Sequence, residues 1–298
     1  MATLYRQKES NIRKTWLLMG MFLLLVIAIG YGISWYLGNP FILYIAVAFA
    51  LFMNVYSYWN SHKLVLRMTG AKPVEKKDAP ELYNIVENLS ITAGLPMPKV
   101  YIIDDPAPNA FATGRNPENA VVAATTGLLQ RLDRSELEGV MAHELAHVGN
   151  RDMLVMTIAV VLAGIIAIVA DFFARAMFFG GGRDKHPIFL VVGIVGIILA
   201  PIAAKMIQLA ISRKREYTAD ATAALLTRYP EGLASALEKI SGYSGPMQKT
   251  SHATAHLFIS DPYGKQSKKR SLGNWFNGLF QTHPPVEQRI AELRRLSS

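Results

Sequence analysis

Four long apolar runs dominate the pattern of hydrophobic and polar positions along the chain. They are Trp16–Leu37, Phe41–Trp59, Met153–Phe179 and Pro187–Ile211. The first two contain no charged residue, and the last two contain only Asp171, Arg175 and Lys205. Each run is close to or above the roughly 20 residues that a helix needs to cross about 30 Å of hydrocarbon. The pattern therefore predicts four transmembrane helices and disfavours four buried core helices in a chain of 298 residues.

The segments between these runs have the mixed pattern of an α+β domain with a small sheet. Short β-branched or apolar runs predict strands at Lys99–Asp104, Asn109–Gly114 and Ala120–Ala124. One predicted helix begins at Asp78-Ala79-Pro80 and ends at Gly94, and a second begins at a Ser135–Glu138 capping box. Three more are predicted at Ser212–Leu226, at Pro230–Ile240 and as a last amphipathic helix that ends near Leu296. The polar stretch Ser241–Thr282 is interpreted as a long mobile segment or an active-site flap.

Together these elements predict a mainly α integral membrane protein with four transmembrane helices and an α+β catalytic domain. Residues 1–60 form a first transmembrane hairpin, and residues 153–211 form a second one. Residues 61–152 and 212–298 are the two parts of the soluble domain.

Basic residues cluster at one set of ends of the apolar runs. Examples are Arg13 and Lys14 before the first run, Lys63 and Arg67 after the second, and Arg213–Lys214–Arg215 after the fourth. An excess of Lys and Arg marks the cytoplasmic side, so both termini and the soluble domain are expected to lie there. The net charge of +9 is explained by this asymmetry and by anionic lipid headgroups, and a nucleic-acid partner is not expected. The lipid bilayer is thus the first predicted partner.

Candidate chemistry lies in the segment His143-Glu144-Leu145-Ala146-His147. Histidines at i and i+4 project from one helix face and can reach one metal ion, whereas the glutamate at i+1 points past it. This is the H-E-x-x-H arrangement, in which two histidines bind zinc and Glu144 acts as the general base. The chain has no cysteine, so any metal must be held by histidine and carboxylate. The alternative is a helix with two unrelated histidines and a surface glutamate.

Glu216 is the predicted third ligand of one Zn²⁺ ion. His147 stands six residues before the third apolar run and Glu216 five residues after the fourth. If the two runs form a hairpin, the helical rise places both residues at similar depths, roughly 7–9 Å below the membrane surface. Asp220, one turn further on, would orient a ligand imidazole. The alternative for both acids is a solvated helix face.

Two further i, i+4 pairs fit structural interpretations better. His252 and His256 have no carboxylate between them, which favours a structural or flap role over a second metal site. Asp171 and Arg175 fall near the outer interface, where a local ion pair is expected.

At these residues the chain resembles the HtpX family of membrane zinc metallopeptidases, relatives of the CAAX prenyl proteases. The motifs that carry the resemblance are the two leading apolar runs, Asn109-Ala-Phe-Ala-Thr-Gly114, His143–His147, the second hairpin, Arg215-Glu-Tyr-Thr-Ala-Asp220 and His283-Pro-Pro. The resemblance implies a gluzincin fold in which Glu216 completes the zinc site. It also implies that His283 donates to the oxyanion, with Arg289 as a helper.

The same resemblance implies that Asn109, Ala110, Phe111, Ala112 and Thr113 form an edge strand that binds substrate by strand addition. It further implies proteolysis of damaged or misassembled membrane proteins, often under envelope stress, in possible cooperation with other quality-control proteases.

The sequence thus predicts a zinc endopeptidase of the bacterial plasma membrane that cuts unfolded or membrane-protein substrates at the cytoplasmic face. Two alternatives remain at this point: a prenyl-protein processing protease, and a quality-control scaffold that binds clients without cutting. Zinc content together with cleavage of casein would separate enzyme from scaffold.

Overall fold

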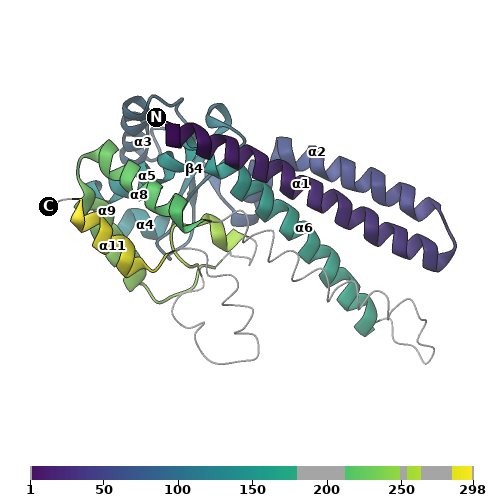
Figure 1. Ribbon diagram of the computed structural model, residues 1–298. Coiled ribbons are helices and arrows are strands. Elements are labelled where there is room, and N and C mark those ends of the chain that lie inside the picture. Colours follow the sequence, from purple (N-terminus) through teal and green to yellow (C-terminus); the bar gives the residue numbers. More distant parts are fainter. Residues whose placement is uncertain (1, 180–211, 249–253, 263–283, 297–298) are drawn as a thin grey trace.

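The computed structural model describes residues 2–179, 212–248, 254–262 and 284–296, with the side chains of the first range described from Glu9 to Ile166. Helices α1 (Ala2–Leu37), α2 (Phe41–Thr69) and α6 (Asp152–Phe179) extend side by side, away from the part that holds the sheet and the shorter helices (Figure 1). The N-terminal end of α1 overlies that second part in the same view.

A tight turn joins α1 and α2. Gly38 takes the left-handed backbone conformation with φ 63°, which favours glycine. The hydroxyl of Ser34 donates to the carbonyl of Asn39, and the side chain of Asn39 accepts from the amide of Phe41. These contacts satisfy backbone groups at the two helix ends without charged side chains, as the apolar end of a membrane hairpin requires.

Two helices in the described residues are long and apolar enough to cross a membrane, Glu9–Leu37 and Phe41–Thr69. A third candidate is the pair α5 (Arg134–Gly149) and α6, which bends by 85° at the break between the two helices. The four predicted spans are therefore matched in part. The fourth run, Pro187–Ile211, and the loop before it lie outside the described residues.

The sheet has four strands in the order β1-β2-β4-β3. The strands are β1 (Lys72–Pro73), β2 (Lys99–Ile103), β3 (Ala110–Thr113) and β4 (Val121–Thr125). β2 and β4 are parallel, while β1 and β3 run antiparallel to their neighbours. β3 is thus an edge strand, as predicted, and it pairs Phe111 with Ala123. β1 was missed, because a two-residue strand that ends in proline carries no alternating pattern.

α5 is the central helix of the soluble part. The other helices described in that part are α3 (Pro80–Ala93), α4 (Thr126–Arg131), α8 (Arg213–Thr227), α9 (Pro230–Gly242) and α11 (Val286–Arg295), with short 3-10 turns η1 (Pro117–Asn119) and η2 (Thr254–Leu257). α5 contacts α3, α8, α9 and β3, so the two soluble stretches of the sequence form one packed body. Gly139 allows the close approach of α9, since a Cβ there would lie 2.6 Å from the amide nitrogen of Leu233.

The capping box of α5 lies two residues before the predicted one. The capping box is formed by Asp133 and Glu136, each of which bonds the backbone N–H of the other. Ser135, the expected cap, instead donates its hydroxyl to Asp133. Glu136 also accepts from Ser235 and Lys239 of α9, which fixes the start of α5 against that helix. Tertiary contacts thus select one of two similar capping patterns.

A smaller correction concerns α3. Its N-cap is Ala79, and the carboxylate of Asp78 turns away to accept from the amide of Glu75. Pro80 begins the helix and Gly94 ends it, as predicted.

The described parts of Ser241–Thr282 pack against the body of the protein. Met247 and Phe258 are buried, the amide of Met247 donates to the carbonyl of Pro262, and the ring of Phe258 meets Phe111 edge-on at 5.3 Å. These residues are therefore part of the packed body, and the mobility of the stretch stays a prediction. Their position against β3 fits the alternative, a flap beside the edge strand.

Candidate metal centre

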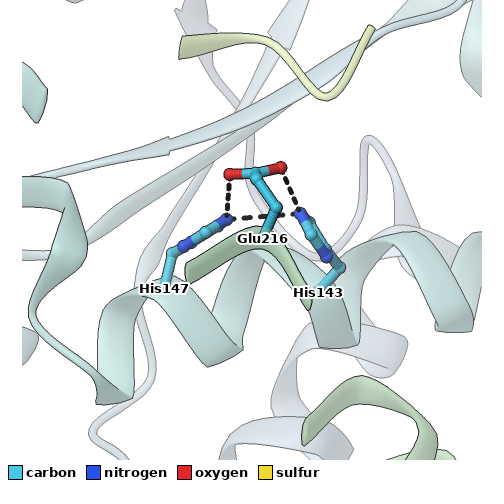
Figure 2. Close-up of side chains that lie close together, drawn as sticks. All are labelled: His143, His147 and Glu216. Carbon is cyan, nitrogen blue, oxygen red and sulfur yellow. Dashed lines mark hydrogen bonds and ion pairs between the residues drawn. The ribbon is translucent and has the colours of Figure 1, made fainter. Parts of the chain in front are cut away.

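Three side chains from two helices converge in the middle of the soluble part. His143 and His147 come from α5, and Glu216 comes from the first turn of α8 (Figure 2). The Nε2 atoms of the two histidines lie 3.2 Å apart. The carboxylate oxygens of Glu216 lie 3.5 Å from Nε2 of His147 and 3.9 Å from Nε2 of His143. All three residues are buried, and one ligand atom from each lies within 4.8 Å of the others.

Two of these positions follow from the sequence and one follows from the packing. Helical spacing puts both histidines on the same face of α5. Glu216 reaches them because α8 packs against α5. The depth calculation that predicted Glu216 assumed that α5 continues into the span, whereas the chain bends by 85° before α6. The predicted residue is in place, but the reason given for it was wrong.

A carboxylate orients each histidine from behind. Asp220 lies 2.9 Å from Nδ1 of His143, and Asp152 lies 3.2 Å from Nδ1 of His147. A carboxylate that accepts from Nδ1–H fixes the ring and leaves Nε2 free to bind a metal. Asp220 was predicted for this position. Asp152 was missed, although an acid at the entrance to a long apolar helix was a signal that could have identified it.

The orientation of His147 depends on a polar cluster that includes the N-terminal helix. Asn11 of α1 donates to Asp152 at 2.7 Å and accepts from Arg215 at 2.8 Å. Nε of Arg215 also lies 3.5 Å from Asp152. All of these side chains are buried, so a membrane helix, α1, is connected to a histidine of the cluster through one aspartate.

Arg289 lies behind the histidines. It was expected to assist at the oxyanion, but its Nε and Nη2 donate to the two oxygens of Asp220 at 2.8 and 2.7 Å. Nη2 also lies 3.4 Å from Nδ1 of His143. The side chain is fully buried, and its Nη1 lies 3.9 Å from the carboxylate of Glu216. Its geometry therefore fits the positioning of Asp220 and His143, and its role at the oxyanion stays a prediction. His283, the other predicted oxyanion donor, lies outside the described residues, as does His252.

Glu144 lies beside the cluster and is fully buried. Burial raises the pKa of its carboxyl to about 7, despite the opposing influence of His147 and Arg289, and the charge of Glu216 adds to the rise. The backbone of Ala112 on β3 hydrogen-bonds to the same carboxyl. A carboxyl with a pKa near neutrality can accept and return a proton, which is the requirement for a general base and acid.

The electrostatics of the cluster favour a bound cation. Burial alone would lower the pKa of His147, but the hydrogen bond to Asp152 and the charges of Glu216, Asp152 and Glu144 raise it to about 9. At His143 burial dominates, and the pKa falls. The arginine beside Asp220 outweighs burial and lowers the pKa of that carboxyl to about 2. Two imidazoles and one carboxylate, set among further carboxylates, are the donor set of a zinc site with one open position.

The predicted substrate strand borders this cluster. The carbonyl of Asn109 accepts from the amide of Thr125 on β4, so by the alternation of strand residues the backbone groups of Ala110 and Ala112 face the free edge. The carbonyl of Ala110 accepts from the amide of Ile259, and the side chain of Asn109 bonds both backbone groups of Ser260. The first half of the edge is therefore covered by the chain itself, and the second half lies next to Glu144.

A buried His-His-Glu cluster with a second glutamate beside it, joined to long apolar helices, defines a membrane metalloprotease. The chain belongs to peptidase family M48, whose model matches residues 76–297. It is 45% identical over 99% of its length to "Protease HtpX homolog" of Caldanaerobacter subterraneus subsp. tengcongensis, covering 98% of that protein. It is 50% identical over 95% of its length to the protein of the same name from Syntrophobacter fumaroxidans, again covering 98%. The resemblance drawn from the motifs is thus confirmed.

A solved structure shares the fold. The crystal structure of S. mikatae Ste24p matches 98% of this chain and 67% of its own with a TM-score of 0.50, at 18% sequence identity. This likeness extends over the membrane helices as well as the soluble part.

Proposed function

We propose that this protein is a zinc-dependent endopeptidase of the bacterial plasma membrane that cleaves misfolded or damaged membrane proteins at the cytoplasmic face. The observation that carries the proposal is the cluster of His143, His147 and Glu216 with the buried carboxyl of Glu144 beside it. Zinc held by the three ligands would supply Lewis-acid activation of water and of the scissile carbonyl.

The residues around the ligands have separate tasks. Glu144 takes the proton from the attacking water and passes it to the departing amine, as its raised pKa allows. Asp220 and Asp152 hold the two imidazoles with Nε2 turned toward Glu216. Arg289 keeps Asp220 ionised and in place through two charge-assisted hydrogen bonds.

The substrate binds as an extended strand along β3. Strand addition at this edge would place a peptide bond beside Glu144, because the backbone of Ala112 already contacts that carboxyl. A peptide that used the whole edge would replace the Ile259 amide at the carbonyl of Ala110. His283 is proposed to donate to the oxyanion, on the strength of its motif.

Location and client class follow from the membrane helices. The basic residues that flank the apolar runs support a cytoplasmic site. Since α1 contacts the site through Asn11, the active site lies close to the membrane boundary, where segments of damaged membrane proteins emerge. A role in the envelope stress response, with other quality-control proteases as partners, completes the proposal.

The test compares three glutamate variants of the purified chain. Glu144→Gln should retain about one zinc per chain and lose casein cleavage by about 100-fold or more, the range for a lost general base. Glu216→Ala should lose both zinc and activity, because two histidines alone hold zinc poorly. Glu138→Gln, on the same helix α5 but outside the cluster, should keep both.

The readouts are metal analysis after gel filtration and the rate of casein cleavage. Full zinc occupancy in Glu216→Ala would remove this residue from the ligand set. Unchanged casein cleavage in Glu144→Gln would refute its role as the base.

A further inference from the structure

A cavity of about 330 Å³ lies between the membrane helices and the soluble part, outside the metal centre. Ile12 and Trp16 of α1 and Tyr58 and Trp59 of α2 form part of its wall. Arg115 lies two residues after β3, and Arg151 lies at the break between α5 and α6. These two arginines add charged groups to the wall. The cavity is therefore built from four distant parts of the sequence.

Among the described residues, the charges that line this cavity are positive. They belong to Arg115 and Arg151, and no carboxylate of the described part of the chain lines it. Neither guanidinium forms an ion pair with any residue in the described part of the chain. The guanidinium of Arg115 is instead held over the ring of Trp59, 4.0 Å from its centroid. Two arginines without carboxylate partners, placed in one cavity, attract an anion, and guanidinium groups suit phosphate in particular.

The cavity lies where the apolar runs of α1 and α2 end, on the side away from the Gly38 turn. Trp16 begins the first run and Trp59 ends the second, and both line the cavity. Trp16 and Trp59 are 62% and 57% exposed, and Trp16 stacks on Tyr58. Exposed Trp and Tyr side chains at the end of a membrane helix mark the interface between hydrocarbon and water. The aromatic wall thus faces lipid while the arginines lie on the side of the soluble part.

We propose that this cavity binds the phosphate headgroup of an anionic phospholipid. The two arginines contact the phosphate, and Trp16, Tyr58 and Ile12 contact the glycerol and the first acyl carbons. Basic pockets between membrane helices suit such headgroups, because the phosphate gains charge-assisted hydrogen bonds while the acyl chains stay in the bilayer.

The two arginines connect the bound lipid to the elements that carry the active site. Arg151 has φ 56°, a left-handed conformation that is costly for a non-glycine residue, and it lies where the chain bends by 85° between α5 and α6. Arg115 directly follows the edge strand through Gly114. A lipid that holds both arginines therefore stabilises the junction of the histidine-bearing helix and the end of the substrate strand together.

The test measures lipid binding by the full-length chain. Delipidated protein is placed in nanodiscs of phosphatidylcholine alone or with phosphatidylglycerol, and bound lipid is counted by native mass spectrometry on ejection. We expect selective retention of phosphatidylglycerol. The double variant Arg115→Gln/Arg151→Gln should weaken it by about tenfold or more, the effect of losing charge-assisted hydrogen bonds.

A matched control removes the same charge elsewhere at the same membrane edge. Lys63→Gln/Arg67→Gln alters two exposed residues of α2 that do not line the cavity, and it should retain the lipid. An equal loss in both double variants would show general attraction to an anionic surface and overturn the site. Arg115→Lys/Arg151→Lys, which keeps the charge, should retain part of the binding, so that the site can still be judged if the glutamine variant folds poorly.

Soluble glycerol phosphate separates a lipid site from a site for free phosphate. Displacement of phosphatidylglycerol only by a large excess of glycerol phosphate supports a lipid site, because the acyl and aromatic contacts then contribute. Equal affinity for the soluble anion would refute the assignment to lipid. Lipid counting does not depend on zinc or on cleavage, so this result is independent of the protease assays.

Discussion

Replacing Asp152 by alanine should weaken zinc binding and destabilise the fold at the same time. Asp152 is 1% exposed and has three partners: Nδ1 of His147 at 3.2 Å, Nδ2 of Asn11 at 2.7 Å and Nε of Arg215 at 3.5 Å. Loss of the acceptor behind a ligand histidine commonly lowers metal affinity by about 10–100-fold. At about 1.4 kcal/mol per tenfold, this corresponds to roughly 1.4–2.8 kcal/mol.

The stability cost of the same change comes from Arg215. Removing one partner of a buried charge pair costs about 3–5 kcal/mol, because the remaining charge is left without compensation. The lower end of that range applies here, since the charge of Glu216 also acts on Arg215 and Asn11 still accepts from it. We therefore expect a loss of about 3 kcal/mol in the free energy of unfolding, together with the weaker zinc binding.

A second buried aspartate provides the control. Asp105 is also 1% exposed, but it accepts from the backbone amides of Ala107 and Gln248, away from the metal centre. Asp105→Ala should lower stability by about 1–3 kcal/mol and leave zinc affinity unchanged. Zinc affinity is measured by chelator competition at a temperature where both variants are folded, and stability by chemical denaturation. Wild-type zinc affinity in Asp152→Ala, or an equal loss in both variants, would refute the orienting role of Asp152.

Three further predictions follow. Because the chain has no native cysteine, an impermeant thiol reagent added outside the cell should label Gly181→Cys and spare Asp261→Cys, and the reverse pattern would invert the proposed orientation. Ala112→Pro removes an edge-facing N–H that also donates to Glu144, and it should raise KM as well as lower kcat, with zinc retained; a lower kcat at unchanged KM would reflect the contact with Glu144 alone, and unchanged kinetics would exclude this edge as the docking strand. Asn11→Ala removes one of the three partners of Asp152, so chelator competition should show a smaller loss of zinc affinity than Asp152→Ala does. An equal or larger loss would contradict the inference that Asn11 acts on His147 through Asp152.

The structure also refines which proline variant is informative. Proline at Phe111 and proline at Ala112 are not equivalent tests of the edge. Strand alternation from the Asn109–Thr125 hydrogen bond turns the amide of Phe111 toward β4 and that of Ala112 toward the free edge. Phe111→Pro would break the sheet itself, whereas Ala112→Pro acts on the free edge, where it removes the N–H offered to substrate and to Glu144.

The sequence by itself determined the features that depend on local periodicity. Spacing of i and i+4 put His143 and His147 on one helix face, and apolar length identified the two helices of the first hairpin. The three longer strands of the sheet and the helices α3, α5, α8, α9 and α11 fell within a few residues of their predicted bounds, whereas the short helix α4 was not predicted. These features were predictable because each is set by residues within one or two turns of one another.

Only the tertiary structure decided how these elements meet. The 85° bend at Arg151, the contact of Asn11 with Asp152 across 141 residues, and the commitment of Arg289 to Asp220 have no local signature. The two contacts depend on which side chains the packing of the helices brings together, because a buried charge needs a partner nearby. For the same reason Glu216 reached the histidines by the packing of α8 on α5, and not by the shared membrane depth from which it was predicted.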